Sequence, residues 1–186
     1  MKYWIRNLRF LGKRWLSIGR KTRIDFSVFI HRAGRGGTIS IGDHCTVGRR
    51  RRHYWAGYPS QTRLVVWGDD AEIVIGNNCH LNGVSVCARR SVRIADDCLF
   101  AAGIQILDSD THRIDSLRRT AELDDPAPIV LGKNVWVGLN AIILKGTTIG
   151  DNCVVGAGAV VKGTFPPDSI IAGNPARVVG KVTVGG

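Results

Sequence analysis

Long apolar runs are absent from this sequence. Its longest apolar stretches within 186 residues, such as residues 134–144, are short and interrupted by Gly and Asn, whereas a membrane-spanning helix needs about 18 or more consecutive apolar residues. The apolar segment of a secretory signal peptide is not expected either, because four cations interrupt the first residues: Arg6, Arg9, Lys13 and Arg14. We therefore expect a cytoplasmic protein.

Acidic residues are scarce in the first third of the chain. Residues 1–63 contain only Asp25 and Asp43 against fifteen Lys and Arg, and the whole chain has a net charge of +11. The basicity is therefore regional, which indicates a local anionic partner rather than a basic fold. With 44% apolar and 22% charged residues, the composition excludes a disordered chain and suits a single domain with a buried core.

An aliphatic residue recurs every six positions through the C-terminal half. The recurring residues are Leu131, Val137, Ile143, Ile149, Val155 and Val161. Related phrases begin upstream at Ile41, Ile75 and Ile94. A period of six matches neither a helix nor a plain strand. It predicts a short strand followed by a corner, with three units closing a coil of about eighteen residues. Stacked coils would bury the aliphatic ladder inside a triangular prism of parallel strands, an all-β solenoid.

The fifth position of each hexad is expected to face inward and to be small. It is occupied by Cys45, Cys79, Cys98, Val135, Ala141, Thr147, Cys153 and Ala159. The fifth cysteine, Cys87, falls on the aliphatic ladder, six residues after Leu81. Cysteines in such positions are packing residues, which argues against a disulfide framework, a metal site or a redox role.

These hexads, written [Leu/Ile/Val]-Gly-x-x-[small]-x, resemble those of the hexapeptide-repeat acyltransferases over about residues 24–181. The segments VWVGLNAIILKGTTIGDNCVVGAGAVVKG and FPPDSIIAGNPARVVGK look like the last coils and closing segment of sugar O-acetyltransferases of the maltose and galactoside type. The resemblance implies a left-handed parallel β-helix that usually assembles as a homotrimer and uses acetyl-CoA. The handedness follows from the resemblance, because the repeat period alone does not fix it.

The hexad pattern fails over residues 108–128, in the polar stretch DSDTHRIDSLRRTAELDDPAP. This stretch is too long for a corner and predicts an extruded loop. Its segment DSDTHRID looks like the Asp-x-Asp-x-His segment of polysaccharide acetyltransferases, which implies that His112 is the general base. A rival function for a β-helix is that of the gamma-class carbonic anhydrases, which need a close pair of zinc-binding histidines. This sequence lacks that pair, because Leu117 stands five residues after His112.

The resemblance implies direct acetyl transfer from the thioester to a sugar hydroxyl. A neutral histidine near pH 7 can take the hydroxyl proton, so no covalent enzyme intermediate is needed. Asp110 or Asp108 would orient the imidazole or contact the substrate, and the backbone N–H of Leu139 would meet the oxyanion. Trp136 would line the thioester end of the site, and Asn82 would contact the acceptor. Each has a structural alternative: a solvated carboxylate, a ring at a subunit seam, or a corner asparagine.

Acetyl-CoA in the resembled family lies along the coils where side chains are small. The matching small residues are Ala141, Gly156, Ala157 and Ala159. Lys162 and Arg177 would meet phosphates at the nucleotide end. Ala141 and Ala159 are alternatively core residues, and the two cations are alternatively solvated charges.

Two basic elements remain. Residues 1–23 carry apolar residues at helical spacing (Trp4, Leu8, Leu11, Trp15 and Ile18) and predict a basic amphipathic helix, which suits either a cap on the solenoid or peripheral contact with a membrane through residues 1–20. The run Arg49–Arg52 stands beside aromatic residues and suits an anionic glycan or sugar nucleotide better than a nucleic acid, with a solvated loop as the alternative.

We therefore expect a helical region over residues 1–23, a β-helix over residues 24–165 with its extruded loop, and a closing segment over residues 166–186. The predicted activity is acetyl-CoA-dependent O-acetylation of a sugar hydroxyl in surface polysaccharide or related glycan synthesis, without a metal. Two alternatives stay open: N-acetylation of an amino sugar, and a non-catalytic scaffold that does not bind acetyl-CoA.

Overall fold

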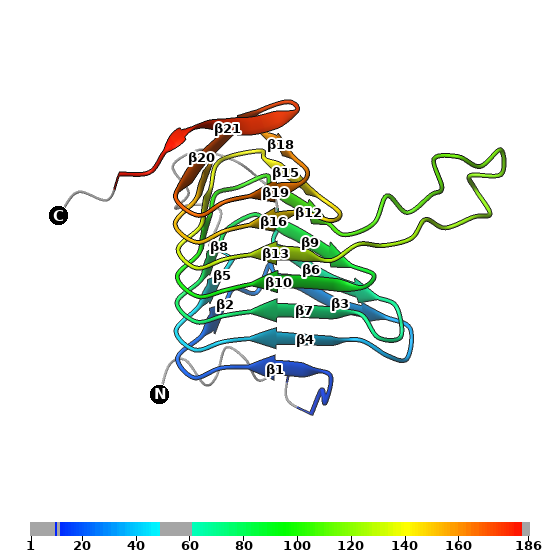
Figure 1. Ribbon diagram of the computed structural model, residues 1–186. Helices are drawn as coiled ribbons and strands as arrows, with labels where there is room; N and C mark the ends of the chain where they lie inside the picture. Colours follow the sequence, from blue (N-terminus) through cyan, green and yellow to red (C-terminus); the bar gives the residue numbers. More distant parts are fainter. Residues whose placement is uncertain (1–9, 11, 49–60, 184–186) are drawn as a thin grey trace.

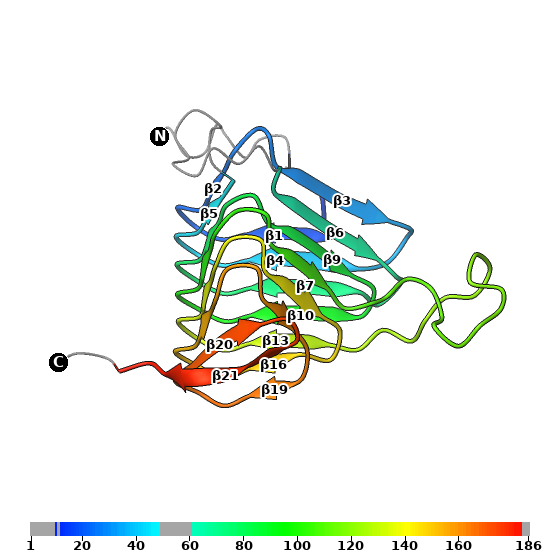
Figure 2. The same cartoon turned by 90° about the horizontal axis from the view of Figure 1, so that it is seen from above.

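The protein is a stack of triangular coils of parallel strands, seen from the side in Figure 1 and from above in Figure 2. The computed structural model describes residue 10, residues 12–48 and residues 61–183. Within these residues, three sheets form the faces of a prism, and the chain visits each sheet in turn as it climbs. The prediction of an all-β solenoid is confirmed.

Each face of the prism is one sheet. The first sheet contains β1 (Leu16–Ile18), β4 (Thr38–Ile41), β7 (Glu72–Ile75), β10 (Ser91–Ile94), β13 (Ile129–Leu131), β16 (Thr148–Ile149) and β19 (Thr164–Phe165). The second contains β2 (Arg23–Ile24), β5 (Thr46–Val47), β8 (His80–Leu81), β11 (Leu99–Phe100), β14 (Trp136–Val137), β17 (Val154–Val155), β20 (Ser169–Gly173) and β21 (Ala176–Lys181). The third contains β3 (Phe29–Ala33), β6 (Arg63–Trp67), β9 (Ser85–Ala88), β12 (Gln105–Leu107), β15 (Ile142–Leu144) and β18 (Val160–Val161).

The aliphatic ladder fills the prism as the repeat predicts. Leu131 pairs with Ile149 in the first sheet, so eighteen residues make one coil, and Val137 pairs with Val155 in the second sheet. All four side chains are buried. Because parallel strands stack about 4.8 Å apart, each inward residue lies directly above its equivalent in the coil below.

The small fifth positions are also buried, and their cysteines hydrogen-bond between coils. The Cys79 N–H donates to Cys45 Sγ at 3.4 Å, and Cys79 Sγ donates to the Ala95 carbonyl at 3.2 Å. The residue before each of these positions turns the corner with a positive φ, 55° at Asn78 and 54° at Asn134. Asn adopts this left-handed conformation more readily than most residues, which explains the polar residue at that place in the hexad.

The described part of the predicted N-terminal helix, residues 12–23, contains strands in place of a helix. Residues 1–9 and 11, which include Trp4, Leu8 and Leu11, lie outside the described residues, but Leu16–Ile18 forms strand β1 and Arg23–Ile24 forms β2. The helical spacing was misleading because IGRKTRI over residues 18–24 is itself a hexad, with Thr22 buried in the small position. Among the described residues, the β-helix therefore begins at β1. No helix among the described residues has the length and apolarity to cross a membrane.

Two features depart from the regular coils. The chain leaves the prism after β12 and returns before β13, so that the predicted loop over residues 108–128 projects outward, as Figures 1 and 2 both show. At one end of the stack, β21 turns back and pairs antiparallel with β20. The loop is thus carried on a rigid scaffold, which is the usual placement of functional residues.

Candidate active site

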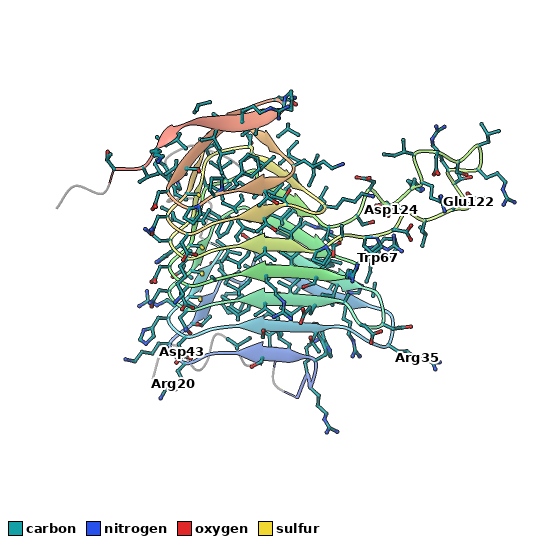
Figure 3. The ribbon with its side chains drawn as sticks, viewed as in Figure 1. Arg20, Arg35, Asp43, Trp67, Glu122 and Asp124 are labelled. Atoms are coloured by element: carbon teal, nitrogen blue, oxygen red, sulfur yellow. The ribbon has the colours of Figure 1, made fainter. Side chains whose placement is uncertain are left out.

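The projecting loop is fastened to the prism where it leaves and returns. Asp124, on the returning leg, is buried and accepts a hydrogen bond from Ser109 Oγ at 2.6 Å on the leaving leg. It also pairs with Arg89 of the coil below at 2.8 Å and with Lys145 of the coil above at 2.7 Å. Figure 3 shows Asp124 at the root of the loop near Trp67, whose ring lies under the Arg89 guanidinium, with Glu122 farther out.

The charges at this root are mutually stabilising. Burial alone would raise the pKa of Asp124, but hydrogen bonds from Lys145, Ser109 and the Asp110 N–H outweigh it and hold that pKa well below its ordinary value. The Lys145 pKa is raised, first by its hydrogen bond to Asp110 and then by that to Asp124. Both groups are therefore charged at neutral pH.

The candidate base, His112, lies on the leaving leg and is exposed. Its Nδ1 is 2.5 Å from the carbonyl oxygen of Arg119, seven residues farther along the loop. A carbonyl oxygen only accepts, so Nδ1 must carry the proton. In the neutral imidazole, Nε2 then presents a free lone pair, which is the form that a general base requires.

The two aspartates proposed beside His112 have other partners. The Asp110 carboxylate pairs with Lys145 at 2.8 Å, and the Arg119 carbonyl orients the imidazole in its place. Asp108 is fully buried, and its two oxygens accept hydrogen bonds from the N–H groups of residues 89, 90 and 91 at 2.7–2.8 Å. It therefore shapes the turn between β9 and β10, and the prediction that it orients His112 or contacts substrate is wrong.

A second group of predicted site residues lies at another corner, where the chain passes from the second to the third sheet. Asn82 and Leu139 are partly exposed there, and Gly156 and Ala157 leave the outer surface free of large side chains. The Leu139 carbonyl accepts a hydrogen bond from the Gly158 N–H at 2.8 Å, while the Leu139 N–H has no acceptor among the described residues. Trp136, 52% exposed, faces outward just before this corner.

The four other residues predicted to bind the cofactor differ in the exposure of their side chains. Ala141 and Ala159 are fully buried, so their side chains pack in the core and do not line a groove. Lys162 and Arg177 are exposed, and Arg177 Nη1 donates to the Ala176 carbonyl at 2.7 Å. That Ala141 and Ala159 contact acetyl-CoA stays a prediction, which only their backbone atoms could satisfy.

The two groups lie at different corners of the prism in this chain. The loop with His112 leaves the corner after the third sheet, whereas Asn82, Leu139 and Gly156 occupy the corner before it. A three-residue strand of the third sheet, about 10 Å long, separates these corners. The basic run Arg49–Arg52 lies outside the described residues.

Sequence reasoning missed Arg89, Asp124 and Lys145. Asp124 had a usable signal, because LDDPAP puts two carboxylates where the polar loop returns to the hexads. The partners had none, since Arg89 and Lys145 are 35 and 21 residues from Asp124 and occupy ordinary corner positions. No group of three His, Cys, Asp or Glu side chains placed to hold a metal occurs in the described part of the chain.

The repeat and the coils make the fold a left-handed β-helix of hexapeptide repeats, similar to that of hexapeptide-repeat acetyltransferases. The family model described as hexapeptide repeat of succinyl-transferase matches residues 128–162. Galactoside O-acetyltransferase of Escherichia coli is 34% identical over 60% of this chain and 55% of its own length. The putative lipopolysaccharide biosynthesis O-acetyl transferase of the same organism is 33% identical over 59% of this chain and 60% of its own.

Solved structures of acetyltransferases are also similar to this chain. A galactoside acetyltransferase in complex with coenzyme A matches with a TM-score of 0.55 at 31% identity, over 63% of this chain and 60% of its own. A hexapeptide-repeat acetyltransferase of Vibrio cholerae with acetyl coenzyme A matches with a TM-score of 0.62 at 25% identity, over 95% of this chain and 76% of its own. The chain spans little more than half the length of the two curated relatives named above.

Proposed function

We propose that this protein transfers an acetyl group from acetyl-CoA to a hydroxyl of a sugar or glycan, with His112 as the general base. The observation that carries the proposal is the hydrogen bond from His112 Nδ1 to the Arg119 carbonyl, because it leaves Nε2 as the basic nitrogen. The similarity to galactoside and lipopolysaccharide O-acetyltransferases supports the acyl donor and the acceptor class.

The reaction needs one proton carrier. His112 Nε2 takes the proton of the acceptor hydroxyl as its oxygen attacks the thioester carbonyl, and the C=O π electrons move to oxygen. The Leu139 N–H is the candidate donor to this oxyanion. When the tetrahedral intermediate collapses, the C–S bond breaks and the imidazolium returns its proton to the CoA thiolate. The Arg119 carbonyl stabilises the imidazolium between these steps.

Acetyl-CoA binding is assigned to the corner with small side chains. The exposed backbone at Gly156 and Ala157 suits the amides of the pantetheine arm, and Lys162 and Arg177 offer cations for its phosphates. Asn82, at the same corner, is the candidate contact with the acceptor. The side chains of Ala141 and Ala159 pack in the core and support this corner.

A complete site requires a second copy of the chain. His112 and the acetyl-CoA corner lie at opposite ends of the third sheet, so the loop of one copy would meet the corner of its neighbour. Leu99 and Trp136 pair in register on the outward face of the second sheet and are 47% and 52% exposed, which offers apolar surface for such a contact. A cyclic trimer satisfies this arrangement. We further propose that the enzyme is soluble and cytoplasmic, with contact between residues 1–20 and a membrane as an open alternative.

The proposal is tested by measuring CoA thiol release with neutral sugars, amino sugars and acidic oligosaccharides as acceptors. We expect turnover with a hydroxyl acceptor and a loss of at least about 100-fold in His112→Ala. His44→Ala, which changes an exposed histidine of a corner, is the matched control and should retain activity. Undiminished turnover in His112→Ala refutes the general base. Acetylation of amino sugars alone would indicate an N-acetyltransferase. Absence of acetyl-CoA binding would indicate a non-catalytic scaffold.

A further inference from the structure

A strained residue directly precedes the candidate base. Thr111 has a φ of 71°, in the left-handed region that β-branched residues rarely adopt. Such backbone strain persists only where the surrounding structure enforces it, and it is concentrated at functional sites. The conformation of Thr111 sets the direction in which the chain presents His112.

Ser109 enforces this conformation. Its hydroxyl oxygen accepts a hydrogen bond from the Thr111 N–H at 2.9 Å and donates to Asp124 Oδ1 at 2.6 Å. The second oxygen of Asp124 accepts the Asp110 N–H at 2.8 Å. A single carboxylate on the returning leg therefore fixes the three residues that precede His112.

Asp124 is itself held from both sides. Arg89 donates to Oδ1 at 2.8 Å from the coil below, and Lys145 donates to Oδ2 at 2.7 Å from the coil above. The Asp124 side chain is 4% exposed, so water does not compete strongly for these contacts. The arrangement transmits the rigidity of two neighbouring coils to the loop.

We propose that Asp124 is the positioning residue for His112, acting through Ser109 and the backbone of residues 110–111. This inference rests on the proposed function for its effect on catalysis, but its structural content is independent of the reaction. Without Asp124, Thr111 relaxes to a negative φ, and the His112 imidazole leaves the Arg119 carbonyl.

The first experiment compares the kinetics of Asp124→Asn with those of Asp125→Asn, a neutralisation of the exposed neighbouring carboxylate. We expect Asp124→Asn to lower kcat about 10- to 100-fold, as misplacement of a catalytic group does, with the KM for acetyl-CoA within about twofold of the wild-type value. Ser109→Ala should lower kcat in the same way. Asp125→Asn should match wild type. A wild-type kcat in Asp124→Asn overturns the proposal.

The second experiment does not need activity. Nitrogen-15 chemical shifts of the His112 ring, assigned with His112→Gln, report which ring nitrogen carries the proton. We expect a single Nδ1–H tautomer in the wild type and in Asp125→Asn, and a mixture in Asp124→Asn. An unchanged tautomer in Asp124→Asn overturns the proposal even if the kcat falls. A wild type that lacks acetyl transfer but shows this pattern refutes the proposed function and retains the positioning role.

Discussion

Val86 and Cys87 are adjacent in β9 and face opposite sides of the third sheet. Val86 is buried and pairs with Ile106, whereas Cys87 is partly exposed and pairs with Leu107. The prediction that Cys87 lies on the inward ladder is therefore wrong. The corner between Leu81 and Val86 is one residue shorter than that between Phe100 and Ile106, and a slip of one residue moves a side chain to the other face of a strand.

This orientation predicts the order of thiol reactivity. In the native protein, Cys87 should react first with an aromatic disulfide reagent, and all five thiols should react after unfolding. Reaction at Cys87 should still be speeding up as pH passes 9.0, because burial and then the nearby Asp108 charge raise its pKa above that ordinary value. The pKa of Cys79 is raised to about 12, with the hydrogen bond to Cys98 and burial outweighing the lowering effect of Cys45. Cys87→Ser should abolish the fast phase, and a fast phase that survives this change contradicts the assignment.

Two glycines at the corner proposed to bind acetyl-CoA allow the effect of close packing to be distinguished from that of backbone conformation. A Cβ on Gly138 would lie 2.7 Å from the Ala157 nitrogen of the next coil, whereas a Cβ on Gly158 meets open space, although φ there is 70°. We expect Gly138→Ala to lower the free energy of unfolding by about 2–3 kcal/mol, because it forces coils apart, and Gly158→Ala by about 1 kcal/mol. Urea denaturation measures both, and the reverse order would count against the coil spacing.

The low pKa of Asp124 predicts a pH-dependent contribution to stability. A carboxyl group with a folded-state pKa below its ordinary value of 3.8 stabilises the folded state fully above that value, and the contribution is lost as pH falls further. Asp124→Asn should therefore cost about 2 kcal/mol at pH 7, measured by denaturation or by amide exchange in the loop. The difference from wild type should narrow below about pH 4. A difference that is constant down to pH 2 would contradict the ion pairs.

A site shared between copies predicts complementation. Ala157 is exposed, so Ala157→Trp should fill the corner without disturbing the core. His112→Ala and Ala157→Trp should each be inactive alone, and their co-expression should restore thiol release in mixed assemblies. The control pairs His112→Ala with the double variant His112→Ala/Ala157→Trp, which has no base and should stay inactive. If the two single variants never complement, the site lies within one chain.

The regular part of the fold was predictable because each coil repeats a local rule. An aliphatic residue followed six positions later by another specifies a strand and a corner whatever its neighbours are, so the ladder from Leu131 to Val161 could be placed without long-range information. The first coil was missed for the opposite reason. Ile18 satisfies helical spacing with Trp15 and hexad spacing with Ile24, and only pairing of Ile18 with Ile41 in the next coil decides between them.

The candidate site was predictable only in part. The position of His112 follows from the interruption of the repeat, but its hydrogen-bond partner, a backbone carbonyl, leaves no trace in side-chain identity. The pairing of Asp110 with Lys145 was equally hidden, since thirty-five positions separate residues that one turn of the solenoid and a loop bring together. Charge partners in a solenoid come from neighbouring coils. Proximity in the sequence therefore favoured His112 as the partner of Asp110, whereas the observed partner is Lys145.

The antiparallel strand β21 has a consequence for self-association. A stack of parallel coils ends in unpaired backbone N–H and C=O groups that could accept another coil, and such an edge is a template for end-to-end fibres. Pairing of Ala172 with Arg177 reverses the strand direction and places β21 over that edge. At the edge of the second sheet, a strand of an incoming stack would then meet reversed polarity and a positively charged side chain, which opposes growth by addition of coils at this end of the molecule.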